Sequence, residues 1–118
     1  MTSGLKTIVH PVGDLEAAKP VYVALLGQPH TDTPYYVGFR VVGEGAEGQE
    51  IGLNPHGHQQ GMTGPVGYWH VPDVPASVAA LVAAGATVQG EPQGVGGGTL
   101  MATVTDPDGN VIGLIQKP

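Results

Sequence analysis

The strongest constraint on the fold of this 118-residue chain is an internal repeat. The segment VGDLEA, which begins at Val12, recurs in altered form as VPDVPA, which begins at Val71, 59 residues later. The tripeptide IGL at Ile51 recurs at Ile112, 61 residues later. Matches in the same order at nearly the same offset predict that the chain contains two copies of one structural unit.

Each copy is expected to be a βαβββ module within a single domain of the α+β class. In each copy an apolar strand precedes an aspartate suited to capping a helix, and a glycine ends that helix. The first module is expected to span residues 5–54 and the second residues 66–116, with residues 55–65 as the linker. The expected strands are residues 5–12, 35–42 and 49–54 in the first module and 66–71, 87–89, 99–105 and 111–116 in the second.

The first helix contains an obstacle, because Pro20 lies six residues after the capping Asp14. Inside a helix a proline removes one backbone hydrogen bond and clashes with the preceding turn. Proline is tolerated as the first helical residue. We therefore expect only a short turn after Asp14 and a helix proper that begins near Lys19 and Pro20.

Charge and composition exclude several classes of partner. Four Lys and Arg against ten Asp and Glu give a net charge of −6, and the four cations form no cluster. Nucleic acids and anionic membrane surfaces require several cations together, so neither is an expected partner. The chain has no cysteine, hence no disulfide framework and no thiolate nucleophile. The apolar stretches are too short to cross a bilayer and the N-terminus lacks a signal-peptide layout, so we expect a cytoplasmic protein.

The repeated V-x-D-[LV] after each first strand, together with the DPDGN turn at 106–110, resembles the vicinal oxygen chelate family. That family includes glyoxalase I, extradiol dioxygenases, methylmalonyl-CoA epimerase and the bleomycin-resistance proteins. The resemblance covers about residues 5–116. It implies a cup-shaped mixed sheet with the helices on the convex side and a small-molecule site on the concave side. It also implies a homodimer.

Metal-binding members of the family place ligands at four positions, which correspond here to Thr7, Gly52, Val66 and Gly113. A hard divalent ion needs carboxylate, imidazole or amide donors. Valine and glycine offer no side-chain donor and a threonine hydroxyl is a weak ligand. We therefore expect no metal ion and no cofactor. Both glycines are expected to face a cavity, where an added carboxylate would be tolerated.

Neighbouring residues of a strand point to opposite faces, which assigns side chains to the cavity. The expected ligand-binding residues are Thr7, Val9, Tyr36, Arg40, Glu50, Tyr68, His70, Met101, Thr103 and Gly113. On the opposite face, Val37 and Phe39 are expected to pack under a helix, and Trp69 is expected in the core.

Two functional hypotheses follow. His70 with Tyr68 or Glu50 could act as general acid and base in a metal-independent lyase, isomerase or hydrolase. His70 could equally be a strand-end residue bonded to backbone, with no chemical task. Because no nucleophile–base pair is evident, we favour a binding protein that sequesters a small organic ligand. An acidic protein with aromatic walls suits a flat or cationic ligand.

The remaining histidines carry weaker signals. His56 and His58 form an H-x-H pair that could hold a metal ion, but the pair has no evident third ligand. We interpret this segment as a polar loop that could bind metal only adventitiously. His10 is expected to be structural on the helix side, and His30 in a turn receives no role.

Overall fold

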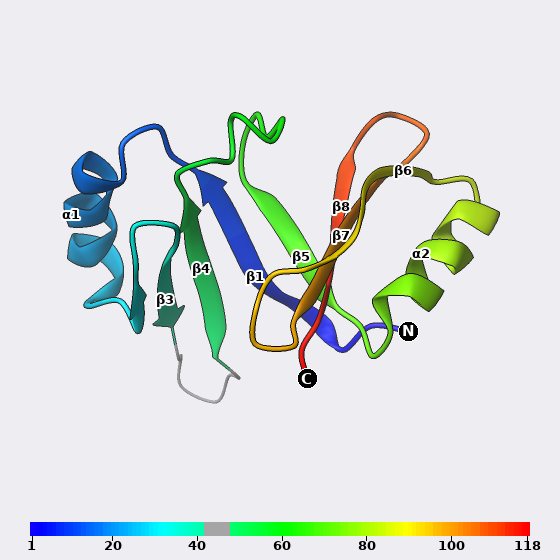
Figure 1. Ribbon diagram of the computed structural model, residues 1–118, viewed down its shortest axis with the longest axis horizontal. Helices are drawn as coiled ribbons and strands as arrows, with labels where there is room; N and C mark the ends of the chain where they lie inside the picture. The colour runs from blue at the N-terminus through cyan, green and yellow to red at the C-terminus, as the bar shows by residue number, and fades with distance from the viewer. Residues whose placement is uncertain (42–47) are drawn as a thin grey trace. The chain divides into compact units, whose positions relative to one another are not determined.

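The computed structural model describes residues 1–41 and 48–118. The described chain forms two compact units (Figure 1). The first unit comprises Lys6–Val66, and the second comprises Gly67–Pro118 together with Met1–Leu5. Two strands cross these bounds by one or two residues, and each is described below with the unit that holds most of it. Both follow the order βαβββ, which confirms the α+β class and the duplicated module expected from the repeat.

The first unit contains β1 (Gly4–Pro11), α1 (Leu15–Leu26), β2 (Thr31–Asp32), β3 (Val37–Val41) and β4 (Gln49–Asn54). Its strands lie in the order β2-β3-β4-β1. β1 and β4 are parallel, whereas β3 is antiparallel to both β2 and β4. Val42, which was expected in the strand over 35–42, lies outside the described residues.

The second unit contains β5 (Val66–His70), α2 (Val74–Ala83), β6 (Thr87–Gly94), β7 (Leu100–Thr105) and β8 (Val111–Gln116). Its strands lie in the order β5-β8-β7-β6. β5 and β8 are parallel, and the remaining pairs are antiparallel. β6 is longer than the three residues expected from the sequence, and its register with β7 shifts at Gly90.

Both helices begin and end where the repeat places its signals. The carboxylate of Asp14 accepts a hydrogen bond from the Ala17 N–H at 3.2 Å, and Asp73 accepts one from Ala76 at 3.0 Å. These bonds satisfy N–H groups that have no partner within the helix. After the helices, Gly27 and Gly85 have φ angles of 88° and 117°, the left-handed region that favours glycine.

The expected late start of the first helix is wrong. α1 is continuous from Leu15, and Pro20 lies inside it. The Asp14 carbonyl already accepts the first helical bond, from the Ala18 N–H at 3.0 Å. Proline removes a single donor, so one lost bond is outweighed by the cap and by the packing of the helix on its sheet.

Each helix covers one face of its sheet and builds a core there. Beneath α1 the fully buried side chains are Val37, Phe39 and Leu53, as expected for the two β3 residues. Between α2 and its sheet the core consists of Val71, Val74, Val78, Ala102, Val104 and Leu114, of which Val74 and Val78 belong to α2. The opposite face of each sheet carries no helix of its own unit, and it is called the helix-free face below.

Trp69 does not lie in the core as expected. The residue is 39% exposed, although its register partner Leu114 is buried. Strand alternation places Trp69 on the helix side, but α2 packs on β6, β7 and β8, and β5 ends the strand order of its unit. The helix therefore covers Leu114 and leaves much of the indole uncovered.

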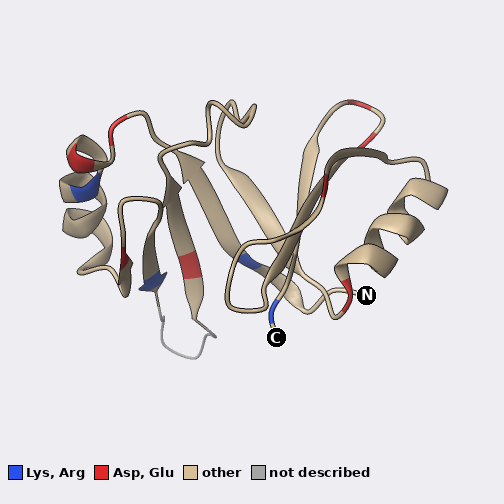
Figure 2. Cartoon of the chain, viewed as in Figure 1, with Lys and Arg blue, Asp and Glu red and all other residues tan. Residues whose placement is uncertain are grey.

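The two helices of the described residues have 12 and 10 residues, and neither is long and apolar enough to span a membrane. Lys and Arg are few and scattered in both units (Figure 2). The expectation that polyanions are not partners of this chain rests on this sparse distribution and stays a prediction.

Candidate functional site

The helix-free face of the first unit is built from two rows of register partners across β3, β4 and β1. One row consists of Arg40, Glu50 and Thr7, and the next consists of Gly38, Gly52 and Val9. Thr7 and Val9 are buried, whereas Arg40 is exposed. The structure therefore brings together on one face the expected residues Thr7, Val9, Arg40 and Glu50.

Tyr36 lies over the glycine row. A Cβ atom built on Gly52 would lie 2.6 Å from Cε1 of the Tyr36 ring, and one built on Gly38 would lie 2.9 Å from its Cε2. Both distances are too short for real side chains. The two glycines therefore leave the space that the phenol ring fills.

The Glu50 carboxylate is hydrogen-bonded to the hydroxyl of the Tyr36 ring. One carboxylate oxygen accepts a hydrogen bond from the Tyr36 hydroxyl at 2.8 Å, and the other lies 3.3 Å from Nε2 of His30. The side chains of Glu50 and His30 are 19% and 35% exposed. Burial, and then the hydrogen bond and charge of Glu50, raise the pKa of Tyr36. The phenol therefore stays protonated and keeps donating to Glu50.

Sequence reasoning missed His30, and the reason is its position before a very short strand. Its backbone N–H donates to the Gly38 carbonyl at 2.9 Å, and its Nδ1 lies 2.9 Å from the Thr31 hydroxyl. Thr31 in turn pairs with Gly38 in the two-residue strand β2. Only this tertiary register carries His30 to Glu50, so no local pattern could have identified it.

The second unit repeats the tyrosine-over-glycine arrangement. A Cβ atom on Gly113 would lie 2.6 Å from Cδ1 of Tyr68 and 2.7 Å from the carbonyl oxygen of Gly67. Tyr68 is buried, and burial raises the pKa of its phenol. The pairings of Gly113 with Tyr68 and Thr103, and of Ile115 with His70 and Met101, place these expected residues on one helix-free face.

These contacts correct the expectation that a carboxylate would be tolerated at Gly52 or Gly113. Neither glycine faces open space, because an aromatic ring occupies the place of a side chain at both. At Gly113 a backbone oxygen also stands in the way, and backbone cannot turn aside as a side chain can.

The positions that correspond to metal ligands do not fit a divalent ion. Gly52 and Gly113 have no donor and are covered by tyrosine rings, and Val66 is a buried hydrocarbon. The remaining position, Thr7, offers one weakly coordinating hydroxyl. Within residues 1–41 and 48–118, no three His, Asp or Glu side chains converge as a metal site would require.

His56 and His58 are exposed residues of a turn, and neither lies in a strand of the two helix-free faces. Asn54 closes it, accepting from the His56 N–H at 2.9 Å and donating to the Gln60 side chain at 3.0 Å. His10 lies on the helix side as expected, with its ring 5.5 Å from that of Tyr22 in α1. Burial lowers the pKa of His10.

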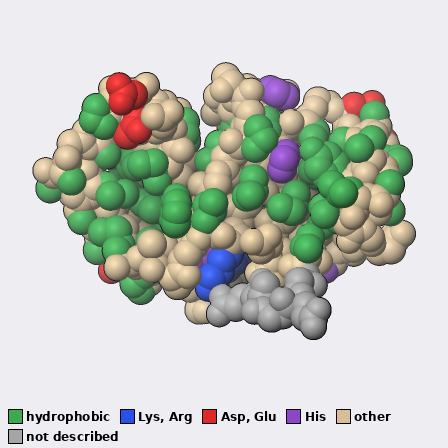
Figure 3. All heavy atoms as spheres, turned by 180° about the vertical axis from the view of Figure 1, so that it is seen from behind, with side chains coloured by type: hydrophobic (Ala, Val, Ile, Leu, Met, Phe, Trp, Pro, Cys, Tyr) green, Lys and Arg blue, Asp and Glu red, His purple; other side chains and the backbone are tan. Residues whose placement is uncertain are grey.

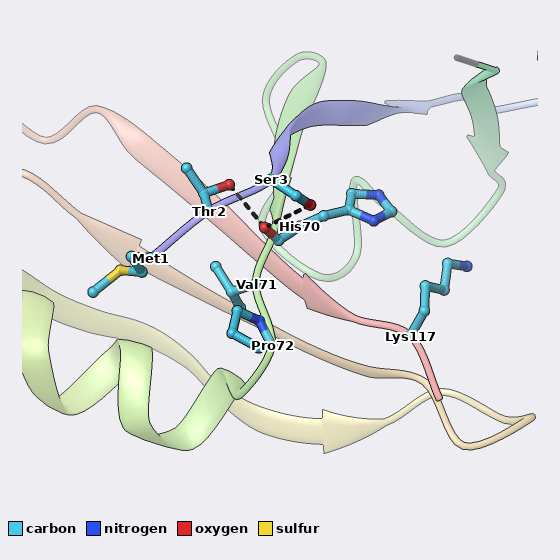
Figure 4. Close-up of a pocket in the computed structure, with 7 residues that line it drawn as sticks. All are labelled: Met1, Thr2, Ser3, His70, Val71, Pro72 and Lys117. Atoms are coloured by element: carbon cyan, nitrogen blue, oxygen red, sulfur yellow. Dashed lines mark hydrogen bonds between the residues drawn. The ribbon is translucent and has the colours of Figure 1, made fainter.

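His70 lies beside a hollow of about 450 Å³ in the second unit (Figure 4). The hollow is lined by Met1, Thr2, Ser3, His70, Val71, Pro72 and Lys117. The His70 carbonyl accepts hydrogen bonds from the Thr2 hydroxyl at 2.8 Å and the Ser3 N–H at 2.9 Å. The contacts of Glu50 are with Tyr36 and His30, and its grouping with His70 and Tyr68 in one site stays a prediction.

A family model described as a glyoxalase-like domain matches residues 7–115. No curated protein matches the sequence significantly. Among solved structures, a Streptomyces coelicolor methylmalonyl-CoA epimerase superposes with a TM-score of 0.76 at 15% identity, covering 99% of both chains. A structure titled as an NAD-dependent benzaldehyde dehydrogenase from Legionella pneumophila gives 0.74 at 17% identity, covering 95% of this chain and 98% of that one.

A Mn(II)-bound glyoxalase from Novosphingobium aromaticivorans superposes with a TM-score of 0.66 at 21% identity. The match covers 98% of this chain and 39% of that longer one. At such identities the likeness shows a common fold and carries no information about the chemistry of this protein. The duplicated βαβββ modules, the matched structures and the family model over residues 7–115 agree: the chain belongs to the glyoxalase-like family of the vicinal oxygen chelate superfamily.

Proposed function

We propose that this protein binds a small organic molecule, without a metal ion, on the helix-free faces that carry Tyr36 and Tyr68. The observation that carries the proposal is the tyrosine ring over Gly52 and its counterpart over Gly113. Gly52 and Gly113 stand at two of the positions where metal-binding family members are expected to supply a ligand atom. In this chain an aromatic ring packs on each of these glycines.

The chemistry of the first unit's face supports a flat or cationic ligand. Aromatic rings offer a surface on which a planar or cationic group stacks. Glu50 lies beside the Tyr36 ring and adds a carboxylate acceptor. The net charge of −6 favours the approach of cations over anions.

A metal-independent acid–base enzyme is the second candidate, and one contact favours it. Glu50 lies 3.3 Å from the His30 imidazole and accepts a bond from the Tyr36 phenol, an arrangement that could move a proton. The earlier hypothesis of acid–base chemistry by His70 with Tyr68 or Glu50 remains an alternative form of this candidate. Lyase, isomerase or hydrolase activity would each fit.

A thermal-shift screen tests the proposed function. The protein would be melted with metabolites and antibiotics, each with a chelator and with added divalent ions. A ligand that binds the native state raises the melting temperature by mass action. We expect at least one organic compound to raise it equally with chelator present. If organic compounds stabilise the protein only when a divalent ion is added, the proposal is wrong.

Paired variants locate the site of any compound found. Tyr36→Leu removes the ring from the face and should weaken binding by about tenfold. Tyr35→Leu is the matched control, because this neighbouring tyrosine is 74% exposed and does not cover the glycine row. Glu50→Gln separates the two candidates: it should lower the turnover of an acid–base enzyme by about 10²–10⁴-fold.

We also propose a homodimer, in keeping with the family resemblance, and a cytoplasmic location. Hydrophobic side chains reach the surface in Figure 3. On α1, Val21 and Leu25 are 67% and 77% exposed. They lie one helical turn apart, and adjacent exposed apolar side chains are typical of association surfaces. Light scattering on wild type and Leu25→Lys tests this. A monomeric wild type would contradict the homodimer.

A further inference from the structure

We propose that the Glu50 carboxylate recognises a cationic ligand and that His30 is an internal counter-cation with which the ligand competes. Binding is then regulated by pH, because His30 competes only when protonated. This inference rests on the proposed function, since it concerns the same helix-free face of the first unit. It identifies Glu50 as the group that recognises the charge of the ligand and His30 as the group that competes with the ligand for Glu50.

Glu50 retains capacity to accept further hydrogen bonds. Its Oε2 accepts from the Tyr36 hydroxyl at 2.8 Å, and its Oε1 lies 3.3 Å from Nε2 of His30. A carboxylate has about four acceptor positions, so two partners do not saturate it. With 19% of its side chain exposed, Glu50 is reachable by a ligand yet partly shielded from water. Partial burial strengthens the attraction between a carboxylate and a cation.

The other groups facing Glu50 within the described part of the first unit do not change charge near neutral pH. Tyr36 has a raised pKa and stays neutral. Arg40 on β3 stands opposite Glu50 in the register and carries a guanidinium group, and Thr7 on β1 has an uncharged hydroxyl. Lys19 and Asp32 pair with each other at 3.2 Å. Histidine is the side-chain type that can gain or lose a charge near neutral pH, and His30 is the histidine that faces Glu50.

A ligand can reach the imidazole of His30 and replace its contact with Glu50. The side chain of His30 is 35% exposed, and its other ring nitrogen is held by the Thr31 hydroxyl at 2.9 Å. Protonated, it forms an ion pair with Glu50 and repels a second cation. Neutral, it no longer offsets any of the negative charge of Glu50. The affinity for a cation should therefore rise with pH.

The test uses benzamidinium, a planar cation, and benzamide, its neutral counterpart, as probes. Each is titrated into ¹⁵N-labelled protein at about pH 5.5 and about pH 8, on either side of the imidazole titration. We expect benzamidinium to shift the amide signals of Glu50 and its neighbours and to bind about fivefold more tightly at the higher pH, as suits a partly exposed ion pair. Benzamide should show no such pH dependence.

Three variants assign the effect to residues. His30→Gln should bind benzamidinium equally at both pH values. His56→Gln is the matched control, because His56 is an exposed histidine of the same unit that lies in the closed Asn54 turn. It should keep the wild-type pH dependence. Glu50→Gln should remove the preference for benzamidinium over benzamide.

Several results would overturn the inference. Equal benzamidinium affinity at both pH values in the wild type would do so, as would an unchanged pH dependence in His30→Gln. Equal binding of benzamide and benzamidinium beside Tyr36 would refute charge recognition and leave the proposed function intact. Binding of neither probe would refute this inference alone, because the chelator-resistant stabilisation in the compound screen tests the proposed function independently.

Discussion

Tyr36 packs against Gly52 so closely that a Cβ atom on the glycine would lie 2.6 Å from the ring carbon Cε1. The pair Tyr68 and Gly113 repeats this relationship in the second unit, also at 2.6 Å from a ring carbon. The two IGL segments thus share a geometrical requirement: each glycine gives room to an aromatic ring. In the first unit that ring also carries the hydroxyl that holds Glu50.

Gly52→Ala should force the Tyr36 ring away from its place and break its bond to Glu50. Overpacking of this kind costs about 1–3 kcal/mol of unfolding free energy. In a Tyr36→Ala background the same glycine change should cost much less, because the space is then empty. Chemical denaturation of the four proteins in this double-mutant cycle measures the coupling. Additive effects would show that the ring and the glycine do not compete for one space.

Gly113→Ala should be harder to accommodate than Gly52→Ala, because the Gly67 carbonyl oxygen would lie 2.7 Å from the new methyl group. We expect a loss of more than about 2 kcal/mol, since backbone must move. Gly94→Ala in β6 is the control, with no atom within 4 Å of its added Cβ. It should stay within about 1 kcal/mol of wild type. Equal unfolding free energies for Gly113→Ala and Gly94→Ala would contradict the packing of Gly113 against the Gly67 carbonyl.

The helix caps give a prediction that is tested twice within one chain. Asp14→Ala and Asp73→Ala each remove a carboxylate that accepts a backbone N–H, at 3.2 Å and 3.0 Å respectively. Each should lower the unfolding free energy by about 0.5–2 kcal/mol. Asp→Asn at either position should recover most of the loss, since an amide oxygen also caps. Failure of asparagine to rescue would mean that charge, not the hydrogen bond, matters.

His10 should make stability fall with acid. Burial lowers its pKa from the ordinary 6.5, so the unfolded chain binds its proton more tightly than the folded protein does. The contribution of His10 to the unfolding free energy is therefore fully present above about pH 6.5. It is lost as the pH falls from there through the lowered pKa of His10 in the folded protein. His10→Phe keeps a ring beside Tyr22 and removes the titration. The difference in unfolding free energy between wild type and variant should change over this range, and a constant difference would contradict the assignment.

The fold was predictable because its determinants are local and duplicated. Asp14 and Asp73 cap helices wherever an apolar run follows, and the alternation of Val37 and Phe39 specifies a face whatever covers it. Pro20 misled the prediction because the cost of one lost helical bond was weighed without the packing that offsets it. The prediction that Trp69 lies in the core was wrong because strand alternation gives the face of the sheet on which a side chain lies. It does not show how far the helix extends over that face.

The candidate site was predictable only in part. Strand alternation predicted that Glu50, Tyr36 and Thr7 share a face, once the ligand positions implied by the family resemblance had indicated which face that is. His30 depends on the two-residue pairing of β2 with β3, which no propensity signals. The contact between Tyr36 and Gly52 is a tertiary contact. No local pattern in the sequence indicates that a tyrosine ring packs on this glycine.

The central claim is that organic ligands bind to the tyrosine-covered faces without a metal ion. The most direct measurement is a ¹⁵N NMR titration of the best-stabilising compound from the screen, in chelator and then with one equivalent of Mn²⁺ or Zn²⁺. We expect the compound to shift the amide signals of Tyr36, Glu50 and Gly52, or of Tyr68 and Gly113, with the same affinity under all conditions. Signals that respond only after the metal ion is added would show that binding requires a metal.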